Sequence, residues 1–243
     1  MEQQDEVRAH VTPAATQDSR PSEKDALAQL ASVCDQRAAL YGLVCRLFIS
    51  EVDDELIDEM RKTPFPARTG DASLDRGYEL IVAYLSRHGQ DAVHDLAIDY
   101  VRTFIGCENT AYSAAYPFES VYTSEKRLLM QEARDEVAAL YKAAGMRVDP
   151  SWRDPEDHVG LELQYMQLMS ERCAEAARAG REEEARSLLV AQRNFLEDHL
   201  VSWVPMMIED LREKAGTDFY RGLSYVTEGL LKTDAEALAS ILS

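Results

Sequence analysis

The chain has few glycines and prolines and no long apolar run. Of its 243 residues, 11 are glycine and 8 are proline. No window approaches the roughly 20 apolar residues that a membrane-spanning helix needs. Segments of alternating polarity joined by Asn-Gly or Gly-Asn turns are also missing, so β-hairpins are not predicted. These absences argue against stable membrane insertion and against a β-sheet fold.

Positive charge is scarce as well. Lysine and arginine together number 26, against 44 aspartates and glutamates, and the net charge is −18. Binding to nucleic acid needs a basic face that neutralises phosphates, so this composition argues against a nucleic-acid partner. The same excess of negative charge attracts a basic partner, such as a peptide that carries arginines.

Cysteine is used sparingly and without metal-binding spacing. The chain has four cysteines, none of them in a Cys-x-x-Cys pair: Cys34, Cys45, Cys107 and Cys173. Their apolar or helical surroundings predict reduced, buried thiols, which are typical of a cytoplasmic protein. Residues 1–21 contain acids, glutamines and two prolines but no apolar segment of a secretory signal. We expect residues 1–21 to be disordered and residues 22–243 to form one domain.

Apolar residues recur at a spacing of three to four along nearly all of residues 22–243. This period predicts an all-α fold, a single globular bundle of about ten helices. The expected helices, placed between capping residues and breakers, are 22–50, 53–63, 74–87, 91–104, 119–144, 155–179, 181–203, 205–214, 218–231 and 234–242. Residues 106–118 form the longest break between them, and a loop of that length is more often functional than accidental.

Two short sequence segments with unusual composition, called words below, stand at the predicted starts of long helices. Residues 154–158 read Asp-Pro-Glu-Asp-His, in which Asp154 would cap a helix and the proline would occupy its first position. That interpretation leaves His158 unexplained, and Glu162, four residues later, could pair with it. Residues 116–122 read Tyr-Pro-Phe-Glu-Ser-Val-Tyr and join the long loop to the next helix. Their tyrosines combine an apolar body with a hydroxyl, which suits the wall of a binding groove.

Two more words extend the pattern, at residues 99–106 (Asp-Tyr-Val-Arg-Thr-Phe-Ile-Gly) and 195–205 (Phe-Leu-Glu-Asp-His-Leu-Val-Ser-Trp-Val-Pro). In the second, His199 and Trp203 lie four residues apart, a spacing that packing on one helix face explains. The four words, in this order, resemble the signature segments of the TorD/DmsD family of cytoplasmic chaperones for molybdenum-containing redox enzymes. The resemblance covers about residues 25–231.

The resemblance implies a TorD-like, all-α cytoplasmic chaperone that catalyses no reaction and needs no cofactor. Its implied partners are the twin-arginine signal peptide and the catalytic subunit of a molybdopterin oxidoreductase. The chaperone would assist insertion of the molybdopterin cofactor and proofread export of the partner through the Tat translocase. The resemblance leaves open whether the chain is a monomer or a homodimer.

The matching positions imply a signal-peptide-binding site made of Tyr116, Glu119, Tyr122, Pro155, Asp157 and His158. Asp157 and Glu119 are expected to meet the arginines of the peptide. His158 and Tyr122 are expected to orient the peptide, and Tyr116 to form part of the groove wall.

Two alternatives stay open at this point. One is a helical-bundle enzyme that binds a metal or a small molecule. Its sequence support is poor, because the pairs Glu156/His158 and Glu197/His199 are spaced by two residues, whereas carboxylate-bridged metal sites use Glu-x-x-His. Phosphate-cradling and nucleophile motifs are missing too. The other alternative is a nitrate-reductase-type (NarJ-like) assembly chaperone with the same fold.

Overall fold

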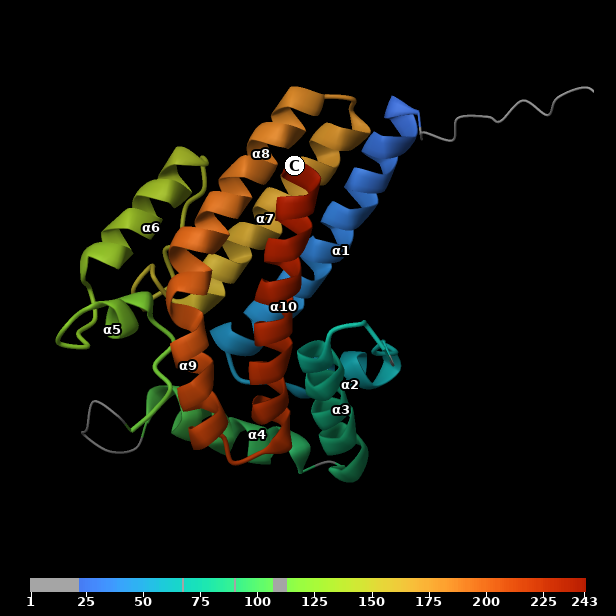
Figure 1. Cartoon of the computed structure of the whole chain (residues 1–243). Helices are drawn as coiled ribbons and strands as arrows, with labels where there is room; N and C mark the ends of the chain where they lie inside the picture. The colour runs from blue at the N-terminus through green and yellow to red at the C-terminus, as the bar shows by residue number, and fades with distance from the viewer. Residues whose placement is uncertain (1–21, 67, 90, 107–112) are drawn as a thin grey trace, which may run out of the picture.

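The computed structural model describes residues 22–243 with gaps at 67, 90 and 107–112 (Figure 1). Within these ranges the chain is helical, and the only β-type pairing is an isolated antiparallel bridge between Phe118 and His158. The predicted all-α bundle is therefore confirmed. Residues 1–21 lie outside the described residues, as do residues 107–112 of the predicted 106–118 loop, which include Cys107. None of the described helices is both long and apolar enough to cross a membrane.

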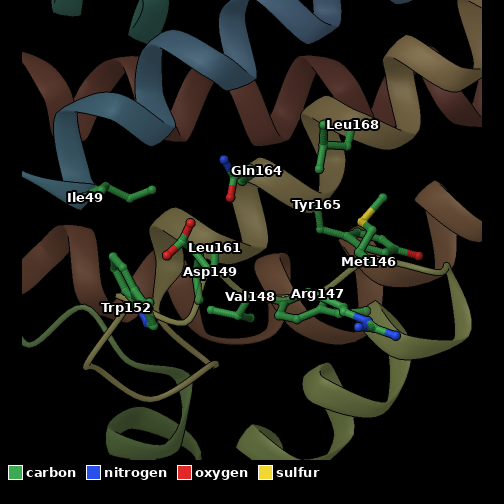
Figure 2. Close-up of a pocket in the computed structure, with 11 residues that line it drawn as sticks. Ile49, Met146, Arg147, Val148, Asp149, Trp152, Leu161, Gln164, Tyr165 and Leu168 are labelled. Carbon is green, nitrogen blue, oxygen red and sulfur yellow. The ribbon is translucent and has the colours of Figure 1, made fainter.

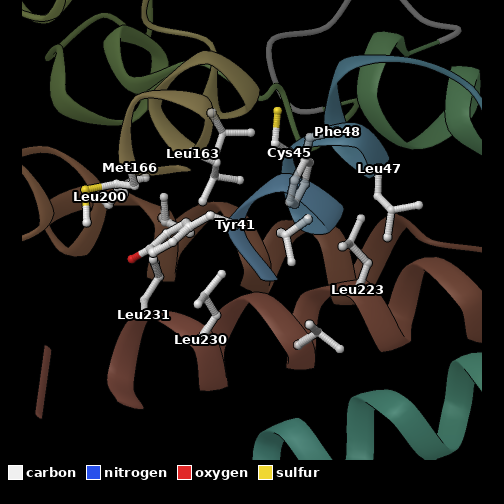
Figure 3. Packing of buried hydrophobic residues seen from close by; sticks show 14 of the residues in the cluster. Tyr41, Cys45, Leu47, Phe48, Leu163, Met166, Leu200, Leu223, Leu230 and Leu231 are labelled. Carbon is white, nitrogen blue, oxygen red and sulfur yellow. The ribbon is translucent and has the colours of Figure 1, made fainter. Parts of the chain in front are cut away.

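The bundle is built around α1 (Glu23–Ile49), which packs along α7 (Val159–Arg178). Beside them run α8 (Glu182–Phe195) and α10 (Asp218–Leu242), as Figure 1 shows. Figure 3 shows Tyr41 and Phe48 of α1 between leucines of the neighbouring helices. Both aromatic side chains are completely buried, so the core that the apolar period predicts lies between these four elements.

The other elements surround this core: α2 (Asp54–Lys62), α3 (Ala72–Arg87), α4 (Ala92–Tyr100), a π-helical segment (Val101–Ile105), α5 (Glu119–Thr123), α6 (Glu132–Ala143), a second π-helical segment (Leu196–Leu200) and α9 (Val201–Lys214). Of these, α3 lies along α10 at very short range. A Cβ added to Gly77 would stand 2.8 Å from the carbonyl oxygen of Gly222, and the converse distance is also 2.8 Å. Larger residues at either glycine would push the two helices apart.

The predicted helix over 119–144 is wrong, because the chain breaks into α5 and α6. Between them Arg127 and Met130 adopt positive φ angles of 51° and 61°. Side-chain contacts of Arg127 stabilise the connection between α5 and α6. The Arg127 guanidinium lies over the Tyr122 ring and bonds Asp210 of α9. The two short helices consequently stand apart from the bundle axis at one side of the molecule (Figure 1).

Three further predicted boundaries are wrong. The helix expected from 155 begins at Val159, with His158 as its N-cap. No break occurs at Pro205, which lies inside α9; the α-helical geometry changes instead at the π-helical segment Leu196–Leu200, through which the helix continues. The break expected between 231 and 234 is absent, because α10 continues to Leu242 and Asp234 lies inside it. Its buried carboxylate accepts hydrogen bonds from Arg37 of α1 instead (2.5 and 2.9 Å).

Candidate binding site

The two words that stood out in the sequence lie side by side in the structure. The Glu119 N–H donates to the Asp157 carbonyl (3.0 Å), and the Val159 N–H donates to the Pro117 carbonyl (2.9 Å). These main-chain bonds form the bridge between Phe118 and His158. Segments that are far apart in the sequence therefore share one site, at the start of both α5 and α7.

The buried side chain of Asp157 holds the two words together by hydrogen bonds. Its side chain is fully buried, and Oδ2 accepts hydrogen bonds from the Ser120 N–H (2.8 Å) and from the Ser120 hydroxyl. The hydroxyl oxygen of Ser120 in turn accepts from the Gln131 N–H, 3.2 Å away, at the entry to α6. The other carboxylate oxygen, Oδ1, is buried without a hydrogen-bond partner among the described residues. Asp157 thus holds α5, α6 and α7 in their mutual positions.

His158 is a buried cap rather than an exposed contact. Its Nδ1 accepts a hydrogen bond from the Gly160 N–H at 3.0 Å. The ring packs edge-on against Phe118 and Trp152, at centroid distances of 5.1 and 5.2 Å. Burial lowers the pKa of His158 to about 3, so the imidazole is neutral. The expected pairing with Glu162 is not formed.

Glu162 belongs to a second buried network, with Glu119, His199 and Trp203. His199 Nδ1 lies 3.1 Å from Glu119 Oε2, and the Trp203 indole N–H donates to Glu162 Oε2, also at 3.1 Å. All four residues are buried. The sequence flagged His199 and Trp203 only as helix packing. The sequence feature that could have linked them to the site is the segment 195–205, which contains both residues.

The charges in this network can be assigned. Burial opposes protonation of His199, but the hydrogen bond and the charge of Glu119 outweigh it, and the pKa of His199 is raised above its ordinary value. Burial, followed by the charge of Glu119, raises the pKa of Glu162 well above its ordinary value. A neutral Glu162 beside an ion pair of Glu119 and His199 is the arrangement that leaves the fewest uncompensated buried charges.

The remaining predicted residues lie nearer the surface. Tyr122 stacks on Trp203 at a centroid distance of 5.6 Å, and its hydroxyl donates to Asp210 at 3.0 Å. Tyr116 is half-buried, and its hydroxyl lies 2.9 Å from the Ser113 hydroxyl. Pro155 is half-buried as well. The structure thus brings both words together but buries Glu119, Asp157 and His158.

A mainly apolar cavity of about 400 Å³ lies beside the second word (Figure 2). It is lined by the aromatic rings of Trp152, Tyr141 and Tyr165 and by aliphatic side chains that include Leu161. Trp152 connects it to the site, because the same ring contacts His158. Apolar side chains of a ligand would find matching surface here.

A polar cleft of about 390 Å³ lies beside the first word and is called the acidic cleft below. Its lining carries the carboxylates of Glu119, Glu132, Glu136 and Asp198. Lysine and arginine are absent from this lining, and the neighbouring His199 pairs with only one of the four carboxylates, so the cleft keeps an excess of negative charge. Helix α6 supplies Tyr141 to the apolar cavity and two carboxylates to the acidic cleft, and therefore separates the two. In the part of the chain that is described, no group of three or more His, Cys, Asp or Glu is placed to hold a metal ion.

Comparison with known proteins agrees with this architecture. The chain belongs to the nitrate reductase delta subunit family, whose sequence profile matches residues 70–209. That range contains all four words and every residue of the predicted site.

Within this family the chain is similar to proteins named chaperone protein TorD. The protein from Vibrio parahaemolyticus serotype O3:K6 is 27% identical over 210 residues, which are 84% of this chain and 95% of the relative. That from Vibrio cholerae serotype O1 El Tor Inaba is 25% identical, with 84% and 92% covered. That from Shewanella pealeana is 26% identical, with 85% and 91% covered. The resemblance inferred from the sequence words is confirmed.

Proposed function

We propose that this chain is a cytoplasmic chaperone for the maturation of a molybdopterin oxidoreductase. In this proposal it binds the twin-arginine signal peptide of the catalytic subunit, assists insertion of the cofactor, and delays export through the Tat translocase until insertion is complete. It acts by binding and not by catalysis. Residues 22–243 act as one chaperone domain. The observation that carries the proposal is the meeting of the 116–122 and 154–158 words at one site next to an apolar cavity.

The apolar cavity suits the hydrophobic stretch of such a peptide. Its rings and aliphatic side chains offer apolar surface, and burial of apolar area is the main favourable term when an extended or helical peptide enters a groove. The His158 ring lies against Trp152 in the wall of this cavity. We propose that His158 orients the peptide through Trp152.

The carboxylates of the site have different positions relative to solvent. Asp157 is fully buried and bonded to Ser120, so we propose that it acts by holding the two words together. Glu119 is also buried, but it forms part of the wall of the acidic cleft. Glu119 is therefore the better candidate of the two for contact with a basic side chain. Tyr116 and Tyr122 are proposed to border the groove on the side of the first word.

A cavity-filling variant tests the proposal. Gln164 is exposed on α7 and lines the apolar cavity, so Gln164→Trp places a bulky ring there at little cost to the core. We expect affinity for a synthetic twin-arginine signal peptide to fall about tenfold, or about 1.4 kcal/mol. Isothermal titration calorimetry provides the measurement. Asn194→Trp, at an exposed position of α8, is the matched control and should bind as the unaltered chain does.

Unchanged affinity of the Gln164→Trp variant would exclude the apolar cavity as the place of the peptide. Absence of peptide binding by the unaltered chain would overturn the proposal as a whole.

A nitrate-reductase-type assembly chaperone is the second candidate. The description of the matched family, nitrate reductase delta subunit, favours it, whereas the names of the similar proteins favour the first proposal. Purification of the tagged chain from its native cells, followed by mass spectrometry of the co-purified protein, separates the two. An exported molybdoenzyme with a twin-arginine signal supports the first proposal, and a nitrate reductase without one supports the second.

A further inference from the structure

The connection between α5 and α6 presents three consecutive apolar side chains to solvent. Leu128, Leu129 and Met130 are 51%, 44% and 58% exposed. In Figure 1 this connection projects from the side of the molecule, away from the bundle. Large apolar side chains scattered singly on a surface are ordinary, but a contiguous group is typical of an interaction surface. We call residues 128–130 the apolar loop.

The apolar loop is held in this conformation by specific bonds. The Ser124 hydroxyl accepts from the Leu128 N–H at 3.0 Å, and the Gln131 side-chain amide donates to the Leu129 carbonyl at 2.8 Å. On the other side, Arg127 bonds Asp210 at 3.3 Å. The outward direction of the apolar side chains is therefore built into the structure.

Helix α9 carries a further exposed apolar side chain. Met206 is 43% exposed and stands four residues from both Ser202 and Asp210, so the three residues share one helix face. Ser202 lines the acidic cleft, and Asp210 holds Arg127. Met206 therefore lies on the face of α9 between the acidic cleft and the Arg127–Asp210 pair, which is next to the apolar loop in the chain.

The acidic cleft is electrostatically unbalanced. Glu132, Glu136 and Asp198 are exposed at its wall, and none of them forms an ion pair among the described residues. The nearby arginines are engaged elsewhere. Arg127 is paired with Asp210, and Arg134 makes a two-point contact with Glu156 (2.5 and 2.8 Å). The charges of Glu136 and Asp198 help to raise the pKa of His199, but this one imidazolium does not balance all the carboxylates. Their excess negative potential is one that a cationic side chain can neutralise.

We infer that the acidic cleft and the apolar loop together bind a basic-then-apolar peptide segment. An arginine or lysine side chain would enter the cleft, and the aliphatic residues next to it would cover Leu128, Leu129 and Met206. The guanidinium group offers five N–H donors, which the separate carboxylates of the cleft can share. This inference rests on the proposed function and places the arginine end of the bound signal peptide there.

Charge makes other occupants of this surface unfavourable. A second copy of the chain would bring its own net charge of −18 against the cleft. A nucleic acid would bring phosphates into the same negative field. A basic peptide is the occupant whose charge and apolar character both match.

The test uses two synthetic peptides and one charge variant. The first peptide carries two adjacent arginines before a leucine-rich stretch, and the second has glutamines in place of the arginines. The variant Glu132→Gln/Glu136→Gln/Asp198→Asn removes the exposed charges and keeps Glu119, which has a structural partner in His199. We expect the variant to bind the arginine peptide about tenfold more weakly than the unaltered chain does, measured by fluorescence anisotropy. It should bind the glutamine peptide with unchanged affinity.

An equal charge change elsewhere is the control. Glu182→Gln/Glu183→Gln/Glu184→Gln alters the exposed start of α8, and it should leave both affinities unchanged. Leu128→Ser/Leu129→Ser should weaken both peptides alike, because it removes the apolar contact only.

If the cleft variant and the unaltered chain bind the arginine peptide equally, the inference fails and the proposed function survives. Equal loss in the cleft variant and in the control would show that only net charge matters, which also overturns the inference. If the unaltered chain binds neither peptide, the proposed function fails together with the inference.

Discussion

His158 shows how burial changes the role of a residue that the sequence makes conspicuous. Its ring is enclosed by Phe118 and Trp152, and its Nδ1 caps α7. In the unfolded chain the same imidazole is free to bind a proton. Because the pKa of His158 is about 3 in the folded protein, against an ordinary value of 6.5, the unfolded chain binds protons more readily. Acid therefore favours unfolding through this residue.

The first prediction follows from this difference in pKa. The stability that neutral His158 provides is fully present above pH 6.5 and is lost as the pH falls toward 3. The variant His158→Asn keeps a side-chain oxygen for the cap but cannot titrate. Between pH 7 and pH 5 the unaltered chain should lose about 2 kcal/mol more free energy of unfolding than the variant. Urea denaturation at both pH values provides the measurement, and parallel losses would contradict the prediction.

Glu119 and Glu162 are two buried carboxyl groups whose replacement by glutamine is expected to change the stability of the protein in opposite ways. Because the pKa of Glu162 is raised, the folded state keeps a proton that the unfolded chain releases, and stability is lost as the pH rises above 4.5. Glu162→Gln removes this loss and retains an acceptor for Trp203, so at pH 7 the variant should be at least as stable as the unaltered chain.

Glu119→Gln should have the opposite effect. It leaves His199 without the negative charge that raises its pKa, and loss of one partner of a buried pair costs about 3 kcal/mol. Thermal denaturation of both variants at pH 7 distinguishes the two roles. Destabilisation of similar size in both would show that Glu162 is ionised in the folded protein.

At the residue scale, the sequence indicated where the site lies but not which way its side chains face. The words 116–122 and 154–158 were singled out by composition, and the structure brings them together. The buried positions of Glu119 and Asp157 could not be predicted. Burial of a carboxylate depends on partners far away in the chain, such as His199 for Glu119. A single sequence without its contacts does not specify those partners.

The elements were predicted well where helical period and capping agree. Ser22 caps α1 and Asp53 caps α2, both as expected, through side-chain oxygens that accept backbone N–H bonds. The break between α5 and α6 was missed because residues 119–144 contain neither glycine nor proline. Its causes are tertiary contacts, among them the bond from Arg127 to Asp210. The helix propensities of residues 119–144 do not reveal such a contact.

The strain at this break is itself testable. Met130 has a φ of 61°, a left-handed conformation that a side chain makes unfavourable by about 1 kcal/mol or more. Met130→Gly relieves that strain. Met130→Ala removes the same exposed side chain beyond Cβ but keeps the backbone strain. The glycine variant should therefore be more stable than the alanine variant by about 1 kcal/mol in urea denaturation. Equal stabilities would mean that the loop relaxes to another conformation.

At the scale of the whole molecule, the net charge of −18 determines how partners approach. A basic peptide is attracted from a distance, and added salt shortens the reach of that attraction, to about 10 Å at 0.1 M. The association rate of a twin-arginine peptide should therefore fall as salt rises, while apolar contacts keep most of the affinity. Stopped-flow fluorescence across a salt series gives the rate. A peptide without arginines serves as control, and a flat profile for the basic peptide would contradict the prediction.

The ion pair between Arg37 and Asp234 joins the first described helix to the last. Arg37 of α1 is buried, and Asp234 lies near the end of α10, with the Tyr41 hydroxyl on the same carboxylate at 2.7 Å. During synthesis α1 leaves the ribosome long before α10 exists. Until then its guanidinium has no buried carboxylate to accept its hydrogen bonds, and burial of an unpaired charge is strongly unfavourable. The core around α1 is therefore expected to close only after α10 has been synthesised, because Arg37 lacks its buried partner until then.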